Sequence, residues 1–295
     1  GPDVETIPNY LCYNMSKINT PIVIPESVKS IGTNAFYYCT SVPSLTLNKA
    51  IKSYTNQFEY CSGLTKVYYT GSIEDWCGIS FSSSTSNPLY YAKNLYIDNT
   101  LATEITIPST VKSIGAYQFY NASCLTKVTL PSTMATINSS AFCGCSNMAA
   151  INLGSTAVTK VYSSAFDGCS KLKEIEFPNS VTSVESSVLS NCTSLRKVTF
   201  GDNVTSIGSS ALYNCTSLRK VTFGKNLTSV GSNALRNCSA LDTIVWNVKT
   251  YNITNSSNTP FNASYVSVYS QIKSFTFGPD VETIPNYLCY NMSKI

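Results

Sequence analysis

An eleven-residue segment occurs twice in this chain, unchanged and 23 residues apart. The segment is NCTSLRKVTFG, at Asn191 to Gly201 and again at Asn214 to Gly224. A fixed period of about 20 to 50 residues is typical of solenoids, propellers and other repeat arrays, in which each repeat forms one small structural unit. The period therefore constrains the fold more than any other feature of the sequence.

Alignment of the copies gives the pattern V-x-x-I-x-x-x-A-[FL]-x-x-C-x-x-L-x-x-[VI]-x-[LF]-[PG]. The V-x-F part alternates apolar and polar residues, which predicts a strand with one buried face. The A-F-x-x-C part has apolar residues three apart, which predicts one tight helical turn. Pro or Gly ends the strand, so one repeat is a strand, a corner, a short extended piece and a helical turn. Because one repeat cannot bury its apolar side chains alone, neighbouring repeats must stack at the strand spacing of about 4.8 Å.

The pattern resembles the leucine-rich repeats of the BspA-like family, on strand residues such as LRKVTF and on the IGSSALYNC type of segment that follows the corner. The resemblance covers nearly the whole chain. It implies a single α/β leucine-rich-repeat solenoid over residues 1–295, with about ten coils of ~23 residues. A parallel β-sheet would line the concave face and short helical turns the convex side. It also implies a non-enzymatic protein, at the cell surface or secreted, that acts in adhesion.

Two segments depart from the period, at about 70–104 and 247–274, and both resemble inserts of this family. In the first, Leu95 to Ile97 and Ile105 to Ile107 flank a turn near Asp98, which predicts a β-hairpin. We expect each insert to form one oversized coil that keeps the solenoid continuous.

Twelve cysteines suggest a disulfide framework, but their positions favour reduced thiols. Stacked coils would point equivalent side chains in parallel rather than toward each other, and a free cysteine between apolar neighbours behaves as a small buried hydrophobe. We expect one column of seven buried, reduced thiols at Cys39, Cys61, Cys145, Cys169, Cys192, Cys215 and Cys238. Cys12 and Cys289 fill the position of Phe in the pattern and are expected in the core. Cys77, Cys124 and Cys143 are then the candidates for a bridge or a reactive thiol.

The chain contains no histidine, which removes Ser-His-Asp and Cys-His nucleophilic machinery and the commonest metal ligand. No phosphate-binding glycine loop occurs, and only Cys143-Gly144-Cys145 approaches the spacing of a cysteine zinc site. Glu174 and Glu176 could form an acid and base pair, but residues two apart on a strand share a face, and two solvated glutamates explain them as well. We expect no enzymatic activity, no cofactor and no metal.

The net charge of +4 is spread over the chain, without the basic run that would attract nucleic acid. No stretch of about 18 apolar residues could span a membrane. In repeat proteins, the residues between the inward strand positions line the default binding surface. We expect a groove for a protein ligand there, such as a host matrix or cell-surface protein, formed by Lys66, Tyr68, Lys127, Arg196, Lys197, Thr199, Arg219, Lys220 and Thr222.

Two alternatives to this binding groove stay open. The same Lys and Thr side chains could simply solvate the sheet and protect it from edge pairing. The whole chain could also be a structural spacer or stalk that presents another domain.

The first 18 residues recur without change at Gly278 to Ile295. This identity predicts a recent duplication or a piece of a longer array, which would continue after Ile295 with a segment close to NTPIVIPESVKSIG. Both ends would then carry strand edges that lack a neighbour. We expect head-to-tail contacts between the termini of two copies at high concentration.

Overall fold

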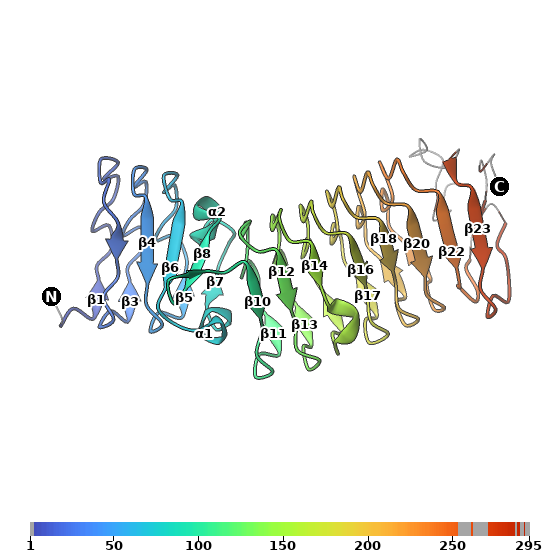
Figure 1. Ribbon diagram of the computed structural model, residues 1–295, viewed down its shortest axis with the longest axis horizontal. Coiled ribbons are helices and arrows are strands. Elements are labelled where there is room, and N and C mark those ends of the chain that lie inside the picture. The colour runs from blue at the N-terminus through green and yellow to red at the C-terminus, as the bar shows by residue number, and fades with distance from the viewer. Residues whose placement is uncertain (1–2, 253–260, 262–270, 287, 290–291, 293–295) are drawn as a thin grey trace.

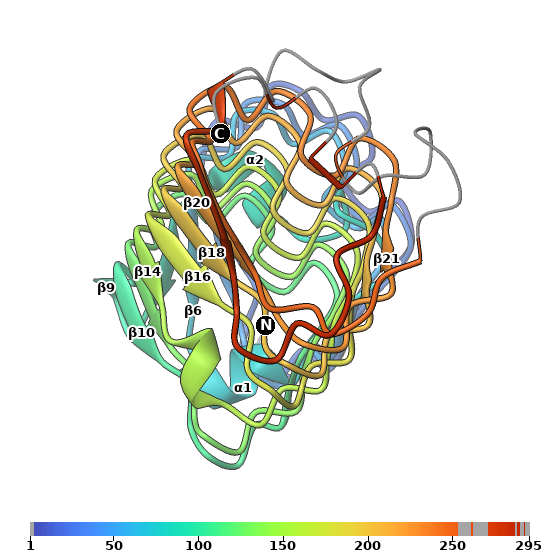
Figure 2. The ribbon, with the colours of Figure 1, turned by 90° about the vertical axis from the view of Figure 1, so that its right-hand side faces the viewer.

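The computed structural model describes residues 3–252, 261, 271–286, 288–289 and 292. These residues form an elongated solenoid whose coils follow one another along a single axis (Figure 1). Viewed along that axis, successive coils nearly superimpose around a shared interior (Figure 2). Equivalent strand residues of regular coils lie 23 positions apart, as Lys197 and Lys220 do. The predicted solenoid with parallel sheets is confirmed.

One wall of the solenoid contains all the described strands of three or four residues, and we call its outer surface the long-strand face. Side chains alternate along each strand between the interior and this face, as the sequence predicts. Hydrogen bonding divides the wall into three sheets, in which β9 is the one antiparallel strand among those described. The first sheet contains β2 (Ile22–Val23), β4 (Ser44–Leu47), β6 (Lys66–Tyr69), β8 (Leu95–Ile97) and β9 (Thr100–Leu101); the second β10 (Glu104–Thr106), β12 (Lys127–Thr129) and β14 (Ala150–Ile151); the third β16 (Glu174–Glu176), β18 (Lys197–Thr199), β20 (Lys220–Phe223), β22 (Thr243–Trp246) and β23 (Ser274–Phe277).

The other wall consists of two-residue strands (Figure 2), most of which follow a Pro or Gly corner. It is also divided into three parallel sheets. These contain β1 (Thr6–Ile7) and β3 (Ser30–Ile31); β5 (Ser53–Tyr54) and β7 (Ser80–Phe81); and β11 (Ser113–Ile114), β13 (Thr136–Ile137), β15 (Lys160–Val161), β17 (Ser183–Val184), β19 (Ser206–Ile207) and β21 (Ser229–Val230).

Apolar side chains from both walls meet in one core that runs along the described chain. Equivalent side chains of successive coils stack on one another. The ring centroids of Phe119, Phe142 and Phe166 follow at 5.3 and 5.6 Å, with planes 4° apart. Phe177 and Phe200 stack in the same way at 5.3 Å. Because these distances are close to the strand spacing of about 4.8 Å, the repeat length dictates the packing.

The third side of each coil is a strip of turns, and here the predicted helical turn does not form. Ser210 and Asn214 adopt left-handed backbone conformations, with φ of 57° and 61°. Two such residues four positions apart end any right-handed helical run, and Asn and Gly tolerate this conformation better than other residues do. The amide of Leu212, between them, donates to Ala234 O of the next coil at 2.8 Å. The strip therefore uses its amides to join coils rather than to build helices.

The predicted column of seven cysteines is buried and reduced. All twelve cysteines lie in the described residues, and all twelve are free. Each thiol of the column donates to a backbone carbonyl of a preceding coil; Cys192 Sγ lies 3.2 Å from Phe166 O, and Cys215 Sγ 3.1 Å from Leu189 O. The column thus contributes hydrogen bonds as well as apolar volume.

The cysteines outside the column are less uniform. Cys12 and Cys289 pack against the core but are only half-buried. Cys124 is buried, while Cys77 and Cys143 are half-buried. Burial raises the pKa of Cys77 to about 12 and that of Cys143 to about 11, so both thiols are protonated at neutral pH. Neither has the lowered pKa of a reactive cysteine.

The first insert forms the predicted oversized coil, in which Val67 of β6 pairs with Leu95 of β8. It contains the helices α1 (Ile73–Cys77) and α2 (Leu89–Ala92); a 3-10 helix, η1 (Leu153–Ser155), lies further along. The core continues through the insert, but the hydrogen-bonded sheets do not, because neither β8 nor β9 pairs with β10 in the described chain. The second insert lies largely outside the described residues, and the strands at its two ends, β22 and β23, pair in parallel.

The hairpin of the first insert closes earlier than predicted. Its turn is at Asp98 and Asn99, which both have positive φ, and a two-residue turn of this kind joins the strands directly. The second strand is therefore Thr100–Leu101, and the prediction of Ile105 to Ile107 was wrong. That segment lies at β10, which begins the next coil and pairs with β12.

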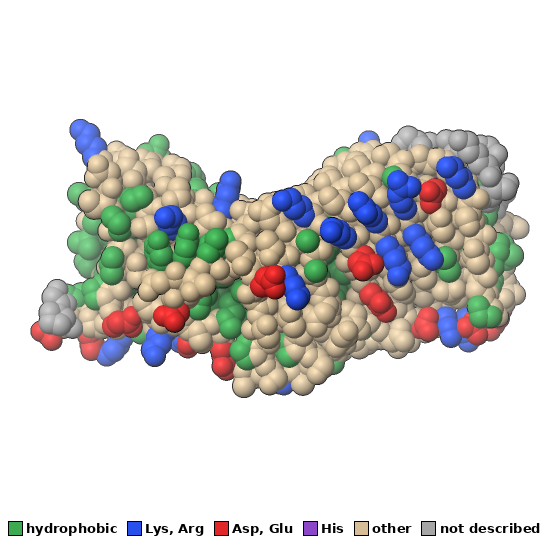
Figure 3. Space-filling view, in the orientation of Figure 1, with side chains coloured by type: hydrophobic (Ala, Val, Ile, Leu, Met, Phe, Trp, Pro, Cys, Tyr) green, Lys and Arg blue, Asp and Glu red, His purple; other side chains and the backbone are tan. Residues whose placement is uncertain are grey.

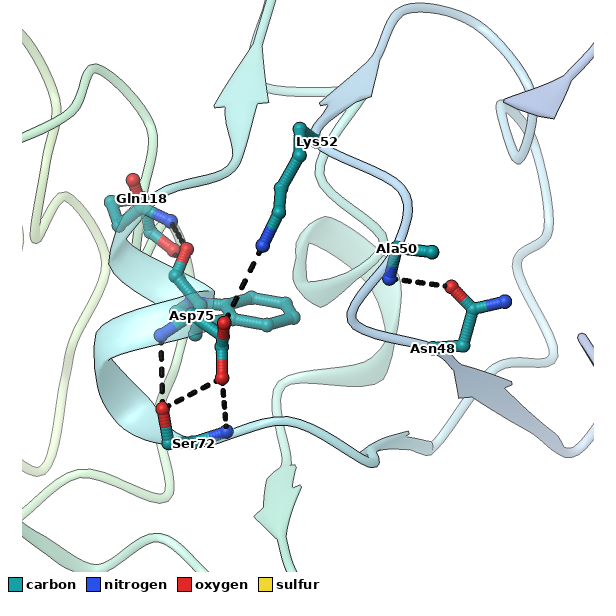
Figure 4. Close-up of polar contacts among 7 residues, drawn as sticks. Asn48, Ala50, Lys52, Ser72, Asp75 and Gln118 are labelled. Atoms are coloured by element: carbon teal, nitrogen blue, oxygen red, sulfur yellow. Dashed lines mark hydrogen bonds and ion pairs between the residues drawn. The ribbon is translucent and has the colours of Figure 1, made fainter. Parts of the chain in front are cut away.

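Helix α1 attaches the insert to the coil that follows. Ser72 caps the helix, because its Oγ accepts from Asp75 N and the Asp75 carboxylate accepts from Ser72 N, both at 3.1 Å. The indole Nε1 of the buried Trp76 donates to Gln118 O at 3.0 Å, and Gln118 Nε2 donates to Trp76 O. Figure 4 shows the Gln118 side chain beside the helix. Buried polar contacts thus span the break in the sheets.

Replacing Phe142 by Ala should lower the free energy of unfolding by about 3–5 kcal/mol, because the ring is fully buried and stacks on both neighbours. Denaturant unfolding followed by circular dichroism measures the loss. Thr129→Ala, on the outer side of β12, is the control and should cost less than about 1 kcal/mol. A loss below about 1 kcal/mol for Phe142→Ala would contradict the stacked core.

The native protein should expose few thiols to a labelling reagent at about pH 8, and denaturant without reductant should release all twelve.

Burial raises the pKa of Cys61 to about 12, whereas the unfolded thiol ionises near 9. The unfolded chain then loses protons first, so stability should fall as the pH rises from about 9 toward 12. Reagent absorbance and the pH dependence of Tm check both points; rapid native labelling of most thiols would contradict them.

Candidate protein-binding face

The long-strand face presents its outward side chains in straight columns, because the strands pair in parallel without a shift. Lys197 lies opposite Lys220, and Thr199 lies opposite Thr222. The two lysines are exposed and the two threonines half-exposed. The structure therefore brings these four predicted site residues together on β18 and β20.

Arg196 and Arg219 lie beside each other at the entrance to the same strands, where Arg219 N donates to Arg196 O at 2.9 Å. Both side chains are exposed. They border a hollow of about 470 Å³, which Thr216, Ser217 and Ala240 complete. Figure 3 shows Lys and Arg side chains gathered over this C-terminal half of the face. The arrangement offers several guanidinium and ammonium groups to an acidic partner.

Acidic side chains border this basic region. Glu174 lies opposite Lys197 in the strand register, and Asp242 Oδ2 lies 4.0 Å from Arg219 Nη1. Glu174, Glu176 and Lys197 also line a polar hollow of about 370 Å³ beside η1. Because these charges are exposed, such pairs contribute little to stability.

Lys66 and Lys127 lie apart from the other predicted basic residues. Lys66 belongs to the first sheet, on β6, and Lys127 to the second, on β12. Lys127 Nζ is 3.9 Å from Glu104 Oε2. The four lysines therefore do not form one column, because the insert interrupts the sheets and Ala150 and Glu174 occupy the intervening positions.

The N-terminal half of the face carries more hydrophobic and fewer basic side chains than the C-terminal half (Figure 3). Tyr68 of β6 lies opposite Tyr96 of β8, with ring centroids 4.7 Å apart and planes 30° apart. Tyr96 was not among the predicted site residues. The apolar alternation of Leu95 to Ile97 indicated a strand, but the irregular insert hid its register with β6.

The described residues contain no group of three or more His, Cys, Asp or Glu side chains that could hold a metal ion. None of the helices in the described part of the chain is long and apolar enough to cross a membrane. The long-strand face presents paired cations, hydroxyls and stacked phenol rings.

Stacked coils of about 23 residues, with one long strand per coil, define a leucine-rich-repeat solenoid. The chain belongs to the family described as the BspA type leucine rich repeat region, whose model matches residues 5–97, 90–216 and 191–295. Among curated proteins, no sequence matches this chain significantly.

Several solved structures are similar to this chain over most of its length. A leucine-rich repeat protein from Bacteroides ovatus is 20% identical, with a TM-score of 0.52, and the match covers 96% of this chain and 66% of that one. The pneumococcal vaccine antigen PcpA is 17% identical, with a TM-score of 0.50, and the match covers 96% and 70%. A leucine rich cell surface protein from Faecalibacterium prausnitzii is 20% identical over 93% and 83%, with a TM-score of 0.46.

The Tyr68 and Tyr96 rings should stabilise each other by about 0.5–1.5 kcal/mol beyond their separate contributions. A double-mutant cycle with Tyr68→Ala, Tyr96→Ala and the double variant measures this coupling through chemical unfolding. A coupling energy near zero would mean that the two rings do not stack in solution.

Proposed function

We propose that this protein is a non-enzymatic protein-binding module, at the cell surface or secreted, which engages an acidic region of a host matrix or cell-surface protein. The observation that carries the proposal is the pairing of like charges, Lys197 with Lys220 and Arg196 with Arg219. Like charges directly opposite each other on a sheet are destabilising. Solvation alone does not favour this arrangement, whereas binding of carboxylates does.

The surface location rests on the family and on one relative. The pneumococcal protein with the same fold is a vaccine antigen. At 17% identity this likeness shows the fold alone, so an exposed location for the present chain is part of the proposal. The open, elongated shape supports it, because a long sheet presents many side chains at once to a macromolecular partner.

The test begins with capture of partners from matrix and serum on the immobilised chain, followed by surface plasmon resonance with each captured protein. Lys197→Gln/Lys220→Gln removes two charges from the face. Substitution by Gln is preferable to Glu, because Glu would add like charges beside Glu174. We expect the association rate to fall by about tenfold at low salt and less at high salt.

The matched control is Lys112→Gln/Lys160→Gln, which removes the same charge from two exposed positions in the wall of two-residue strands, one directly before β11 and one on β15. This variant should bind as the unmodified protein does. Equal loss in both variants would show a general charge effect and no specific face. The absence of any specific partner would favour the structural spacer instead.

A further inference from the structure

The wall of long strands is open between the hairpin and the next coil. β9 runs back along β8, and the chain then reverses at Ala102 to enter β10, with Thr103 N donating to Leu101 O at 2.9 Å. In the described chain β9 pairs with β8 and β10 pairs with β12, but β9 and β10 do not pair with each other. The two strands therefore form a wedge that is narrow at Ala102.

A hollow of about 560 Å³ occupies this wedge, within the range of about 300–1,000 Å³ found for ligand-binding clefts. Apolar side chains such as Ile73, Leu101 and Ile105 line it, together with the acidic Asp98 and Glu104; Lys and Arg do not contribute to its lining among the described residues. Figure 3 shows apolar side chains near the junction of the two halves of this face. The hollow thus favours an apolar group flanked by a positive charge.

The edge of β10 that faces the hollow carries backbone groups without a partner strand. On its other edge, Lys127 N donates to Thr103 O, and Ile107 N donates to Thr129 O at 2.9 Å. Successive residues of a strand direct their amides and carbonyls to opposite sides. Those of Glu104 and Thr106 therefore point away from β12, and no strand of the described chain pairs with them. A free edge of this kind is a template for another strand.

The paired edge of β10 shows which sequence this strand accepts. Residues Glu104 to Thr106 lie in parallel register with Lys127 to Thr129. The acidic residue lies opposite the basic one, the apolar residue opposite the apolar one, and threonine opposite threonine. The Lys127 and Glu104 side chains are within 3.9 Å. The free edge presents the same three residues to the hollow.

We propose that this wedge binds an extended segment of a partner protein by β-strand addition. The segment carries a basic, an apolar and a hydroxyl residue in succession. It pairs with the backbone of Glu104 and Thr106, buries its apolar side chain in the hollow and places its basic side chain beside Glu104. The site does not depend on the basic region of β18 and β20, and it binds a peptide of the opposite charge.

The probe is a fluorescein-labelled octapeptide, SLRKVTFG, which copies Ser194 to Gly201 and contains the required succession. Fluorescence polarisation with the full chain should show saturable binding. A scrambled peptide of the same composition should bind at least about tenfold more weakly. Equal binding of both peptides, or no saturable binding at about 1 mM peptide, would overturn the proposal.

Two substitutions at Thr106 distinguish the contribution of its backbone N–H to peptide binding from that of its side chain. Thr106→Pro removes the N–H that faces the hollow, and proline is tolerated on an edge strand. Thr106→Ala keeps that N–H. Thr106→Pro should weaken binding by about tenfold or more, while Thr106→Ala should change it by less than about threefold. Peptide affinity that is unchanged in Thr106→Pro would overturn the proposal.

A measurement on the unmodified protein guards against misfolding of the proline variant. Saturating peptide should slow hydrogen exchange of the Glu104 and Thr106 amides, and exchange that stays unchanged would overturn the proposal. Lys197→Gln/Lys220→Gln should leave peptide affinity within about twofold, since those charges lie in another sheet. Failure of this site is thus distinguishable from failure of the proposed function.

Discussion

Backbone hydrogen bonding between successive coils is the constraint on which this structure depends. Each coil is too small to satisfy its own amides and carbonyls, so it meets them on the coils before and after it. The strand spacing then forces equivalent side chains into columns, which is why Phe rings, thiols and amides all stack. Asn191 Nδ2 donates to Asp167 Oδ1 at 2.9 Å, and Asn214 Nδ2 donates to Asn191 Oδ1 at 3.1 Å, so even the polar columns are internally bonded.

The repeat pattern was sufficient to predict the solenoid, the inward apolar positions and the reduced cysteine column. Periodicity carries this information because each coil sits in the same environment. It did not predict the turn strip, since three-residue apolar spacing suits a helical turn as well as a pair of turns with left-handed residues. Asn214 was the available signal, because Asn tolerates positive φ.

Features of the candidate site were predictable only where the repeat is regular. The neighbouring Lys197 and Lys220 follow directly from the 23-residue period. The separation of Lys66 from Lys127, and the stacking of Tyr96 on Tyr68, depend on the register of an irregular insert. A tight hairpin turn at Asp98 decides that register, and alternation along a strand says nothing about its partner. The insert thus makes the face locally distinct, where identical coils would make it uniform.

The interrupted sheets also have a mechanical consequence. The junctions between successive coils are arranged in series, so tension along the solenoid axis acts on all of them at once. Extension therefore begins at the junction with the fewest contacts. At the other junctions between described strands, a strand ladder holds at least one of the two walls, and at most of them it holds both. Between β8 and β10, and between β7 and β11, such ladders are absent from the described residues. The junction is held instead by side-chain contacts such as the Trp76 and Gln118 pair, and by single backbone bonds such as that from Cys124 N to Lys93 O at 3.2 Å. A chain held at both ends would therefore yield first at this joint, and the more regular C-terminal half would remain folded as a unit.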